Sequence, residues 1–136
     1  MRRFEDTYRH KGLRKKLIDS LREKGINDEQ VLSAMNNIPR HFFLDTALDN
    51  IAYEDRAFPI AEGQTISQPY TVAYQTQLLQ VKPQEKILEI GTGSIYQATV
   101  LAEMGAKVFT IGRQKALFDK SKQFVLKSKY PGIKFF

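Results

Sequence analysis

Residues 86–94 read Lys-Ile-Leu-Glu-Ile-Gly-Thr-Gly-Ser and carry the clearest structural signal in the chain. The segment 86–90, with its apolar Ile87, Leu88 and Ile90, is typical of a short strand, and the glycines that follow it predict a tight turn. Residues 95–104 then predict a helix that stops at Gly105. A glycine turn between a strand and a helix brings backbone N–H groups and a helix N-terminus against a ligand. A nucleotide-like cofactor is therefore expected here, although a plain tight turn would give the same pattern.

The sequence after this turn continues in the same alternating way. Residues 107–111 predict a second strand, residues 113–129 a basic helix, and residues 133–136 the beginning of a third strand. Strand, helix, strand, helix, strand is the βαβαβ half of a doubly wound parallel sheet. We therefore expect an α/β fold whose Rossmann-like half spans residues 83–136 and is truncated in its third strand.

Residues 1–82 are expected to hold N-terminal helices and a loop. Leucines at every fourth position predict a helix over about residues 7–24, which a glycine ends. Asn27 or Asp28 can cap a second helix, and this helix must end before Pro39.

A less regular segment follows. Residues 38–66 predict a packed loop with aromatic anchors and short strands. Ser67 or Gln68 can cap a further helix that begins at Pro69 and runs to about Gln80. We expect the N-terminal part and the Rossmann-like half to form one compact unit.

Composition excludes several classes of protein. The 136 residues contain no cysteine, and no apolar run exceeds three residues. This excludes a disulfide framework, a thiolate nucleophile and a membrane-spanning helix, so we expect a cytoplasmic protein without a membrane partner. His10 and His41 lie far apart without metal-ligand spacing, so no metal site is expected. A serine hydrolase is not expected either, because a nucleophile-elbow pattern is missing.

The positive charge lies at the two ends of the chain. Residues 1–24 carry a net charge of +5, residues 25–106 carry −6, and residues 107–136 carry +7. The basic ends have the pattern of helix faces, whereas the acidic middle holds the informative motifs. We therefore expect no nucleic-acid partner. A basic nucleic-acid-binding module is kept as a further hypothesis that salt-sensitive DNA or RNA binding would test.

The motifs together resemble those of one family, the protein-L-isoaspartate O-methyltransferases. The resemblance covers nearly the whole chain, and the Gly-Gln-Thr-Ile-Ser-Gln-Pro-Tyr block is its most specific part. The matching segments are Ile38–Phe42, Ala52–Asp55, Gly63–Tyr70, Ile87–Ser94, Tyr96–Ala98 and Arg113–Leu117. The family transfers a methyl group from S-adenosylmethionine to the α-carboxylate of an isoaspartyl residue, which begins the repair of damaged proteins.

The resemblance implies roles for particular residues. It makes Ser67 the active-site hydroxyl and lets Thr65 shape the substrate loop. A carboxylate is already ionised at neutral pH, so hydroxyls and backbone amides suffice and no strong base is needed. By the same resemblance, the S-adenosylmethionine region comprises Glu89, Gly91, Thr92, Gly93, Ser94, Ile95 and Gly112.

The chain departs from the family pattern at the cofactor region. Ile95 stands where the family has a third glycine, and its side chain should obstruct the pocket or displace the turn. Gly112 stands where the family has an acidic residue that binds the cofactor ribose. Losing that charged acceptor costs about 1.5–3 kcal/mol, roughly 10- to 150-fold in affinity. The sequence also stops at Phe136, so we expect very weak or no S-adenosylmethionine binding and no methyl transfer.

A truncated sheet would leave the strand at 86–90 with an exposed hydrophobic edge. We expect two chains to cover this edge by strand pairing or segment exchange, which gives a homodimer. The sequence thus supports two functions of different classes. One is a member of the methyltransferase family that has lost its activity and whose family partners are isoaspartyl proteins. The other is a non-catalytic, self-associating scaffold.

Overall fold

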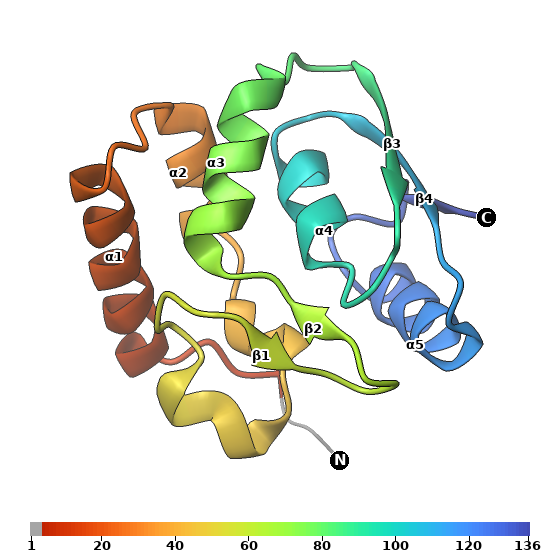
Figure 1. The fold of residues 1–136 in the computed structure, drawn as a ribbon, viewed down its shortest axis with the longest axis horizontal. Coiled ribbons are helices and arrows are strands. Elements are labelled where there is room, and N and C mark those ends of the chain that lie inside the picture. Colours follow the sequence, from red (N-terminus) through yellow and green to blue (C-terminus); the bar gives the residue numbers. More distant parts are fainter. Residues whose placement is uncertain (1–3) are drawn as a thin grey trace.

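A computed structural model describes residues 4–136. Figure 1 shows α1, α2 and α3 on one side of the molecule, and the strands β3 and β4 with α4 and α5 on the other. The elements run in the order α1 (Tyr8–Glu23), α2 (Glu29–Asn36), η1 (Arg40–Phe43), η2 (Thr46–Ile51), β1 (Phe58–Pro59), β2 (Thr65–Ile66), α3 (Pro69–Leu79), β3 (Lys86–Ile90), α4 (Tyr96–Glu103), β4 (Lys107–Ile111), α5 (Lys115–Leu126) and β5 (Lys134–Phe135), where η denotes a 3-10 helix.

The first two helices begin close to where the sequence predicts them, and a side chain caps each of them. The Thr7 side chain accepts a hydrogen bond from the His10 backbone N–H, and the His10 ring accepts one from the Thr7 N–H. Asp28 caps α2 by accepting from Gln30 and Val31. These reciprocal bonds satisfy N–H groups that a helix start leaves without partners, so both predicted helices are confirmed.

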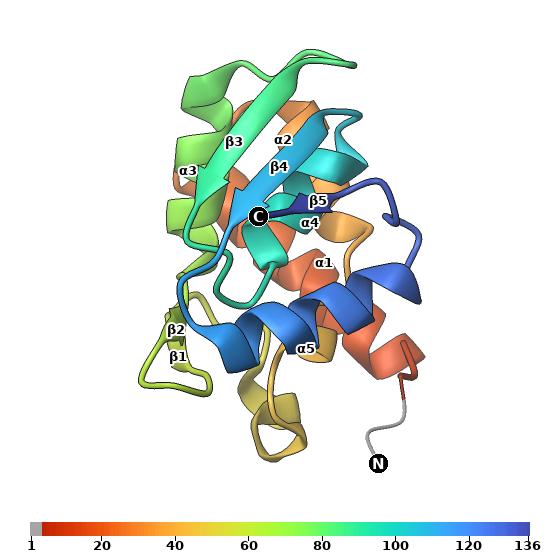
Figure 2. The same ribbon diagram turned by 90° about the vertical axis from the view of Figure 1, so that its right-hand side faces the viewer.

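The expected half of a parallel sheet is also present. β3, β4 and β5 pair in parallel in that order, and β1 pairs with β2 in a separate antiparallel hairpin. In Figure 2 no helix crosses in front of β3 and β4, so α4 and α5 leave that face of the strands uncovered. The α/β fold class is therefore confirmed, with α5 shorter than the helix predicted over residues 113–129.

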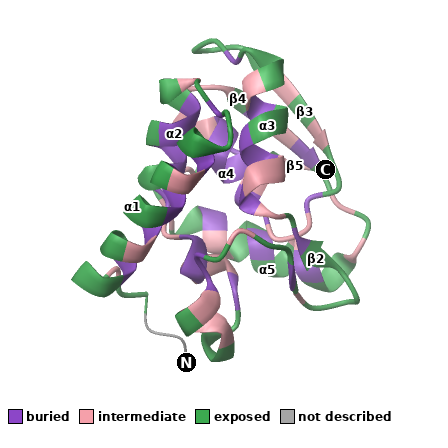
Figure 3. Cartoon of the chain, turned by 60° about the vertical axis from the view of Figure 1, so that its left-hand side comes forward, coloured by how far each residue is buried: buried purple, intermediate pink, exposed green. Residues whose placement is uncertain are grey.

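Two clusters of buried side chains form the core. One fills the space between α1, α2 and α3 and includes Tyr96 and Val100 of α4; the other lies between α4, α5 and the parallel sheet. Figure 3 shows the inward faces of these helices as buried and their outer faces as exposed. Because α4 contributes to both clusters, we propose that the parts divided at residue 82 fold together as one unit. Within residues 4–136, no helix is long and apolar enough to cross a membrane.

Candidate functional site

A small cavity lies between the loop 63–70 and the glycine turn after β3. Its volume is about 80 Å³. Segments that are more than twenty residues apart in sequence meet here, because α3 leads from the loop back to the start of the sheet. The lining residues are Thr65, Ile66, Ser67, Val72, Glu89, Gly91, Thr92, Gly93, Ser94, Tyr96 and Gln97.

Most residues predicted for the site line this cavity. The two loop residues, Thr65 and Ser67, line one part of the cavity. The other part is lined by residues of β3 and the glycine turn, which are Glu89, Gly91, Thr92, Gly93 and Ser94. The remaining two predicted residues, Ile95 and Gly112, are absent from the lining. The loop and the turn thus form a single site, and the two departures from the family pattern lie beside it.

Ile95 was expected either to obstruct the cavity or to displace the turn, and it is not among the residues that line the cavity. Displacement of the turn stays a prediction. Ile95 adopts a left-handed backbone conformation with φ 68° and ψ 5°, a region that β-branched residues rarely enter. Its side chain is buried in the cluster with Val108, Val125 and Ile133. The Ile95 N–H donates to the Thr92 carbonyl at 2.8 Å, so the turn closes with the side chain directed into the core.

Gly112, which the resemblance includes in the cofactor region, does not line the cavity. A Cβ atom at this position would lie 2.8 Å from Thr92 Oγ1 and 2.9 Å from a ring carbon of Phe118. Contacts this short are repulsive, so only glycine fits without a shift of its neighbours. A side chain at position 112 would therefore require Thr92 of the turn or Phe118 of α5 to move.

A chain of hydrogen bonds occupies the base of the cavity. Thr110 of β4 donates to Glu89 at 2.6 Å, and the hydroxyls of Thr110 and Thr92 lie 2.8 Å apart. Burial raises the pKa of Glu89 to about 7, and the hydrogen bond from Thr110 opposes this shift only in part. Glu89 therefore faces the hydroxyl of Thr110 in this cavity.

Asp55 anchors the loop 63–70 through two hydrogen bonds. One carboxylate oxygen of Asp55 accepts the Tyr70 backbone N–H at 2.8 Å, and its backbone carbonyl accepts the Gln68 side-chain amide at 3.2 Å. Gln68 precedes α3 but makes no side-chain cap. Asp55 thus supplies the capping carboxylate from another segment, and Lys24 forms an ion pair with it.

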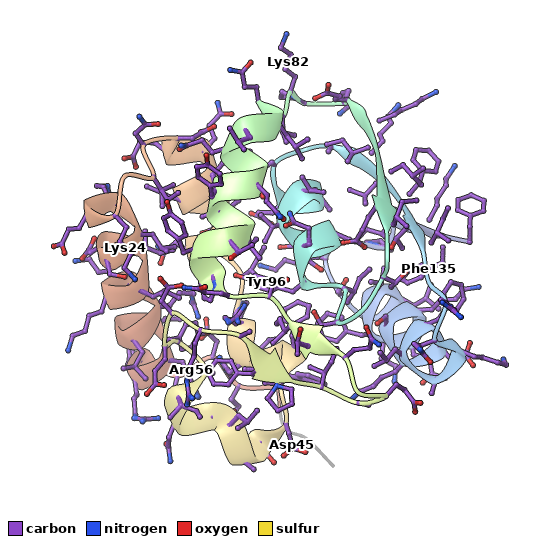
Figure 4. All side chains as sticks on the ribbon, in the orientation of Figure 1. Lys24, Asp45, Arg56, Lys82, Tyr96 and Phe135 are labelled. Carbon is purple, nitrogen blue, oxygen red and sulfur yellow. The ribbon has the colours of Figure 1, made fainter. Side chains whose placement is uncertain are left out.

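Several site residues were not predicted from the sequence. Tyr96 lies near the centre of the molecule in Figure 4, and Gln97 donates to the Thr76 hydroxyl at 3.0 Å. Thr110 is opposite Glu89 in the register of the parallel strands. Since side chains at paired positions share one face of a sheet, that register could have indicated Thr110. Tyr96 and Gln97 belong to the segment Tyr96–Ala98 that carries the family resemblance, but no site role was assigned to them.

A second group of polar side chains lies at the N-terminal end of the fold. His10 and His41 are far apart in the sequence but meet in the fold, and Asp6 lies close to both. The two imidazole rings stack with centroids 3.7 Å apart and planes inclined by 10°.

This geometry does not suit a metal centre. Lone pairs of parallel stacked rings cannot converge on one ion. Both ring nitrogens of His41 already lie 2.8 Å from oxygens of Tyr53 and Glu5, and the Asp6 carboxylate makes two bonds to Arg14. The cluster instead ties the N-terminal segment to the core.

The fold and the site define a class: a Rossmann-like half-sheet with a glycine turn facing a hydroxyl-bearing loop, as in S-adenosylmethionine-dependent methyltransferases. The family model for protein-L-isoaspartate(D-aspartate) O-methyltransferase matches residues 12–135. The chain therefore belongs to the protein-L-isoaspartate O-methyltransferase family.

Relatives and solved structures agree with this assignment. A protein-L-isoaspartate O-methyltransferase from Cytophaga hutchinsonii is 62% identical over 122 residues, covering 90% of this chain and 55% of that protein. One from Christiangramia forsetii is 56% identical over 127 residues, covering 93% and 60% respectively. The chain thus spans little more than half the length of these relatives.

Two solved structures share the fold. A protein-L-isoaspartate O-methyltransferase superposes with a TM-score of 0.81 at 25% identity, covering 90% of this chain and 41% of that chain. A Plasmodium falciparum protein described as such an enzyme, in complex with S-adenosyl-L-homocysteine, superposes with a TM-score of 0.73 at 25% identity, covering 90% and 61%. Family members bind S-adenosylmethionine, and this complex holds its demethylated product.

The cavity of this chain does not fit that cofactor in its present shape. Sites for drug-sized ligands enclose about 300–1,000 Å³, whereas this cavity has about 80 Å³. The backbone N–H groups of Gly91 and Thr92 both donate to the Ile111 carbonyl, at 2.8 and 3.1 Å, so they are not free for a ligand. Side chains around Gly112 leave no space for a ribose-binding carboxylate.

Proposed function

We propose that this chain is a protein-L-isoaspartate O-methyltransferase relative that keeps the family's carboxylate loop and does not transfer a methyl group. The loop 63–70 would receive the α-carboxylate of an isoaspartyl residue in a damaged protein. Ser67 would donate its hydroxyl hydrogen to that carboxylate, and Thr65 would shape the loop. A carboxylate is ionised at neutral pH, so this binding needs hydrogen-bond donors and no general base.

The observation that carries this proposal is the closed glycine turn together with the small cavity beside it. Methyl transfer requires the carboxylate and the methyl donor to be aligned and shielded from water. The turn amides of Gly91 and Thr92 are bonded to Ile111, and the cavity is much smaller than a cofactor site. A loop without a bound donor can hold a carboxylate but has no partner for the reaction.

A calorimetric titration with S-adenosylmethionine tests the proposal directly. We expect no saturable heat, corresponding to a dissociation constant weaker than about 1 mM. The Cytophaga hutchinsonii relative serves as the positive control, and circular dichroism establishes that the sample is folded. Saturable binding, followed by methylation of an isoaspartyl peptide at the relative's rate, would show that the proposal is wrong.

Self-association is a second candidate function, because one observation favours it. Within residues 4–136, no strand pairs with the second edge of β3, and Leu88 and Ile90 of this strand are exposed. An unpaired apolar edge is a template for pairing with another chain. We propose a homodimer formed through this edge, which is compatible with a non-catalytic scaffold.

The other expectations about location and partners stay predictions. A cytoplasmic location is still suggested by the cysteine-free composition. The lack of a nucleic-acid partner is still suggested by the position of the basic residues in the two end segments.

A further inference from the structure

Arg40 is a buried cation that contacts two of the residues lining the cavity, Ser67 and Tyr96. Only 1% of its surface is exposed, and it lies in η1, outside every segment that lines the cavity. Among residues 4–136, no carboxylate lies within ion-pair distance of its guanidinium. Burying a charge without a counter-ion is costly, so an arginine at this place requires an explanation beyond stability.

The guanidinium donates to three backbone carbonyls, which belong to two separate segments of the chain. Nη2 donates to the Ser67 carbonyl at 2.9 Å and to the Arg56 carbonyl at 3.4 Å, and Nε donates to the Ala52 carbonyl at 3.2 Å. The segment 52–56 is thereby joined to the loop that carries the proposed carboxylate-binding hydroxyl.

The same group also contacts the other half of the site. Its central carbon lies 5.0 Å from the ring centroid of Tyr96, the first residue of α4 after the glycine turn. Tyr96 is itself buried and lines the cavity. Arg40 therefore touches the backbone of Ser67 on one side and the ring that follows the turn on the other.

Arginine has the geometry for this task. Its planar fork can donate to several carbonyls and stack on an aromatic ring at once, whereas a lysine ammonium is a single point of charge on a flexible stem. One of its nitrogens, Nη1, has no hydrogen-bond partner.

We propose that Arg40 is a positioning residue that fixes the backbone of Ser67 relative to Tyr96, and so sets where the Ser67 hydroxyl lies against the glycine turn. This inference rests on the proposed function in so far as Ser67 receives a carboxylate. The positioning itself concerns only the loop and can be measured without a ligand.

Segment-resolved amide hydrogen exchange tests the positioning. In Arg40→Met and Arg40→Lys we expect exchange in residues 64–72 to accelerate by about tenfold more than in α1. Leu21→Ala, at a buried position of α1, is the control for a general loss of stability and should accelerate exchange evenly. If both Arg40 variants give the even pattern of the control, or if Arg40→Lys restores the parent pattern completely, the positioning role is wrong.

Titration with an isoaspartyl peptide separates this inference from the proposed function. If the parent binds the peptide, both Arg40 variants should weaken binding by about tenfold or more, while Leu21→Ala should leave it unchanged. Equal affinity in the parent and the Arg40 variants would overturn the inference. If the parent binds no peptide, the proposed function of the loop fails, and the exchange pattern still decides the role of Arg40.

Discussion

Glu89 is the residue whose charge state depends most on its surroundings in the cavity. Burial raises its pKa to about 7 from an ordinary value of 4.5, so the folded chain holds a proton that the unfolded chain loses. The contribution of Glu89 to stability is therefore greatest below pH 4.5 and declines as the pH rises toward 7. We expect Glu89→Gln to raise the melting temperature at pH 8 and to leave it nearly unchanged at pH 4.5.

The direction of this effect can be checked by thermal unfolding across the two pH values. A neutral amide still accepts the hydrogen bond from Thr110 and avoids the cost of a buried charge. Glu23→Gln, at an exposed position of α1, is the matched control and should show no comparable difference. A variant of Glu89 that loses stability at pH 8 would contradict the assignment.

Ile95 illustrates why a residue that breaks a local rule can persist. A left-handed conformation costs an L-residue about 1–2 kcal/mol. Full burial of an isoleucine side chain contributes about 1.5–3 kcal/mol in the opposite direction. Burial therefore offsets the strain, because the side chain lies in the cluster between α4, α5 and the sheet. From the sequence, an obstructed pocket or a displaced turn was expected at this position, and the burial of the side chain was not predicted.

At the scale of elements, local signals were sufficient where the capping partners are close in sequence. Thr7 and His10 are three residues apart, and Asp28 caps the residues directly after it, so both helix starts could be predicted. The cap of α3 comes instead from Asp55, fifteen residues before the Tyr70 N–H that it accepts. Such a partner depends on the fold of the intervening hairpin, and no local pattern indicates it.

The same distinction holds for the site. The loop and the glycine turn could each be recognised as motifs, and their meeting was implied by the family resemblance. The packing of Phe118 and Thr92 against Gly112 could not be predicted, because it depends on how α5 lies against the turn. Arg40 was likewise missed, since its role depends on backbone carbonyls of residues distant in sequence.

The contact between α1 and η1 contains the stacked histidines, which makes it sensitive to acid. The His41 ring donates to the Glu5 carbonyl through Nε2, so its Nδ1 accepts from Tyr53, whose hydroxyl also accepts from Arg14. Protonating Nδ1 would leave the Tyr53 hydroxyl hydrogen without this acceptor. Asp6, Arg14 and Lys11 on the N-terminal side and Asp49 of η2 are the charged groups around the pair.

Burial, with the neighbouring His10 charge, lowers the pKa of His41 from its ordinary value of 6.5. The unfolded chain therefore binds a proton at His41 more readily than the folded one, and the contribution of His41 to stability is lost as the pH drops below about 6.5. We expect NMR titration to show the lowered pKa of His41. His10→Gln removes the neighbouring charge and should raise that pKa. An unchanged His41 titration in this variant would mean that the rings do not interact.

At the scale of the whole molecule, no helix covers the outer face of β3 and β4 (Figure 2). Side chains of β3 alternate, so Lys86, Leu88 and Ile90 lie on the same face. Leu88 and Ile90 are 58% and 74% exposed. Their register partners Phe109 and Ile111 continue this apolar face onto β4, which Figure 2 shows turned toward the viewer.

Besides this face, β3 has an edge that pairs with no other strand among residues 4–136. Two copies of the chain can fill the hydrogen bonds of this edge if β3 pairs in antiparallel with β3 of the second copy. A two-fold axis at Leu88 places the two Leu88 side chains opposite each other and sets Lys86 against Ile90, so no like charges face across the pair. An axis at Glu89 would instead set two carboxylates opposite each other, which is unfavourable. We therefore expect the dimer to be centred on Leu88.

Leu88→Lys should then convert the dimer to a monomer, because two ammonium groups would face each other across the axis. The exposed position lets the variant keep its fold. Leu78→Lys, at an exposed apolar position of α3, introduces the same charge elsewhere and should remain dimeric. Sedimentation velocity at micromolar concentration distinguishes the two. A monomeric mass for the unmodified chain, or a dimer that survives Leu88→Lys, would exclude pairing through this strand at this register.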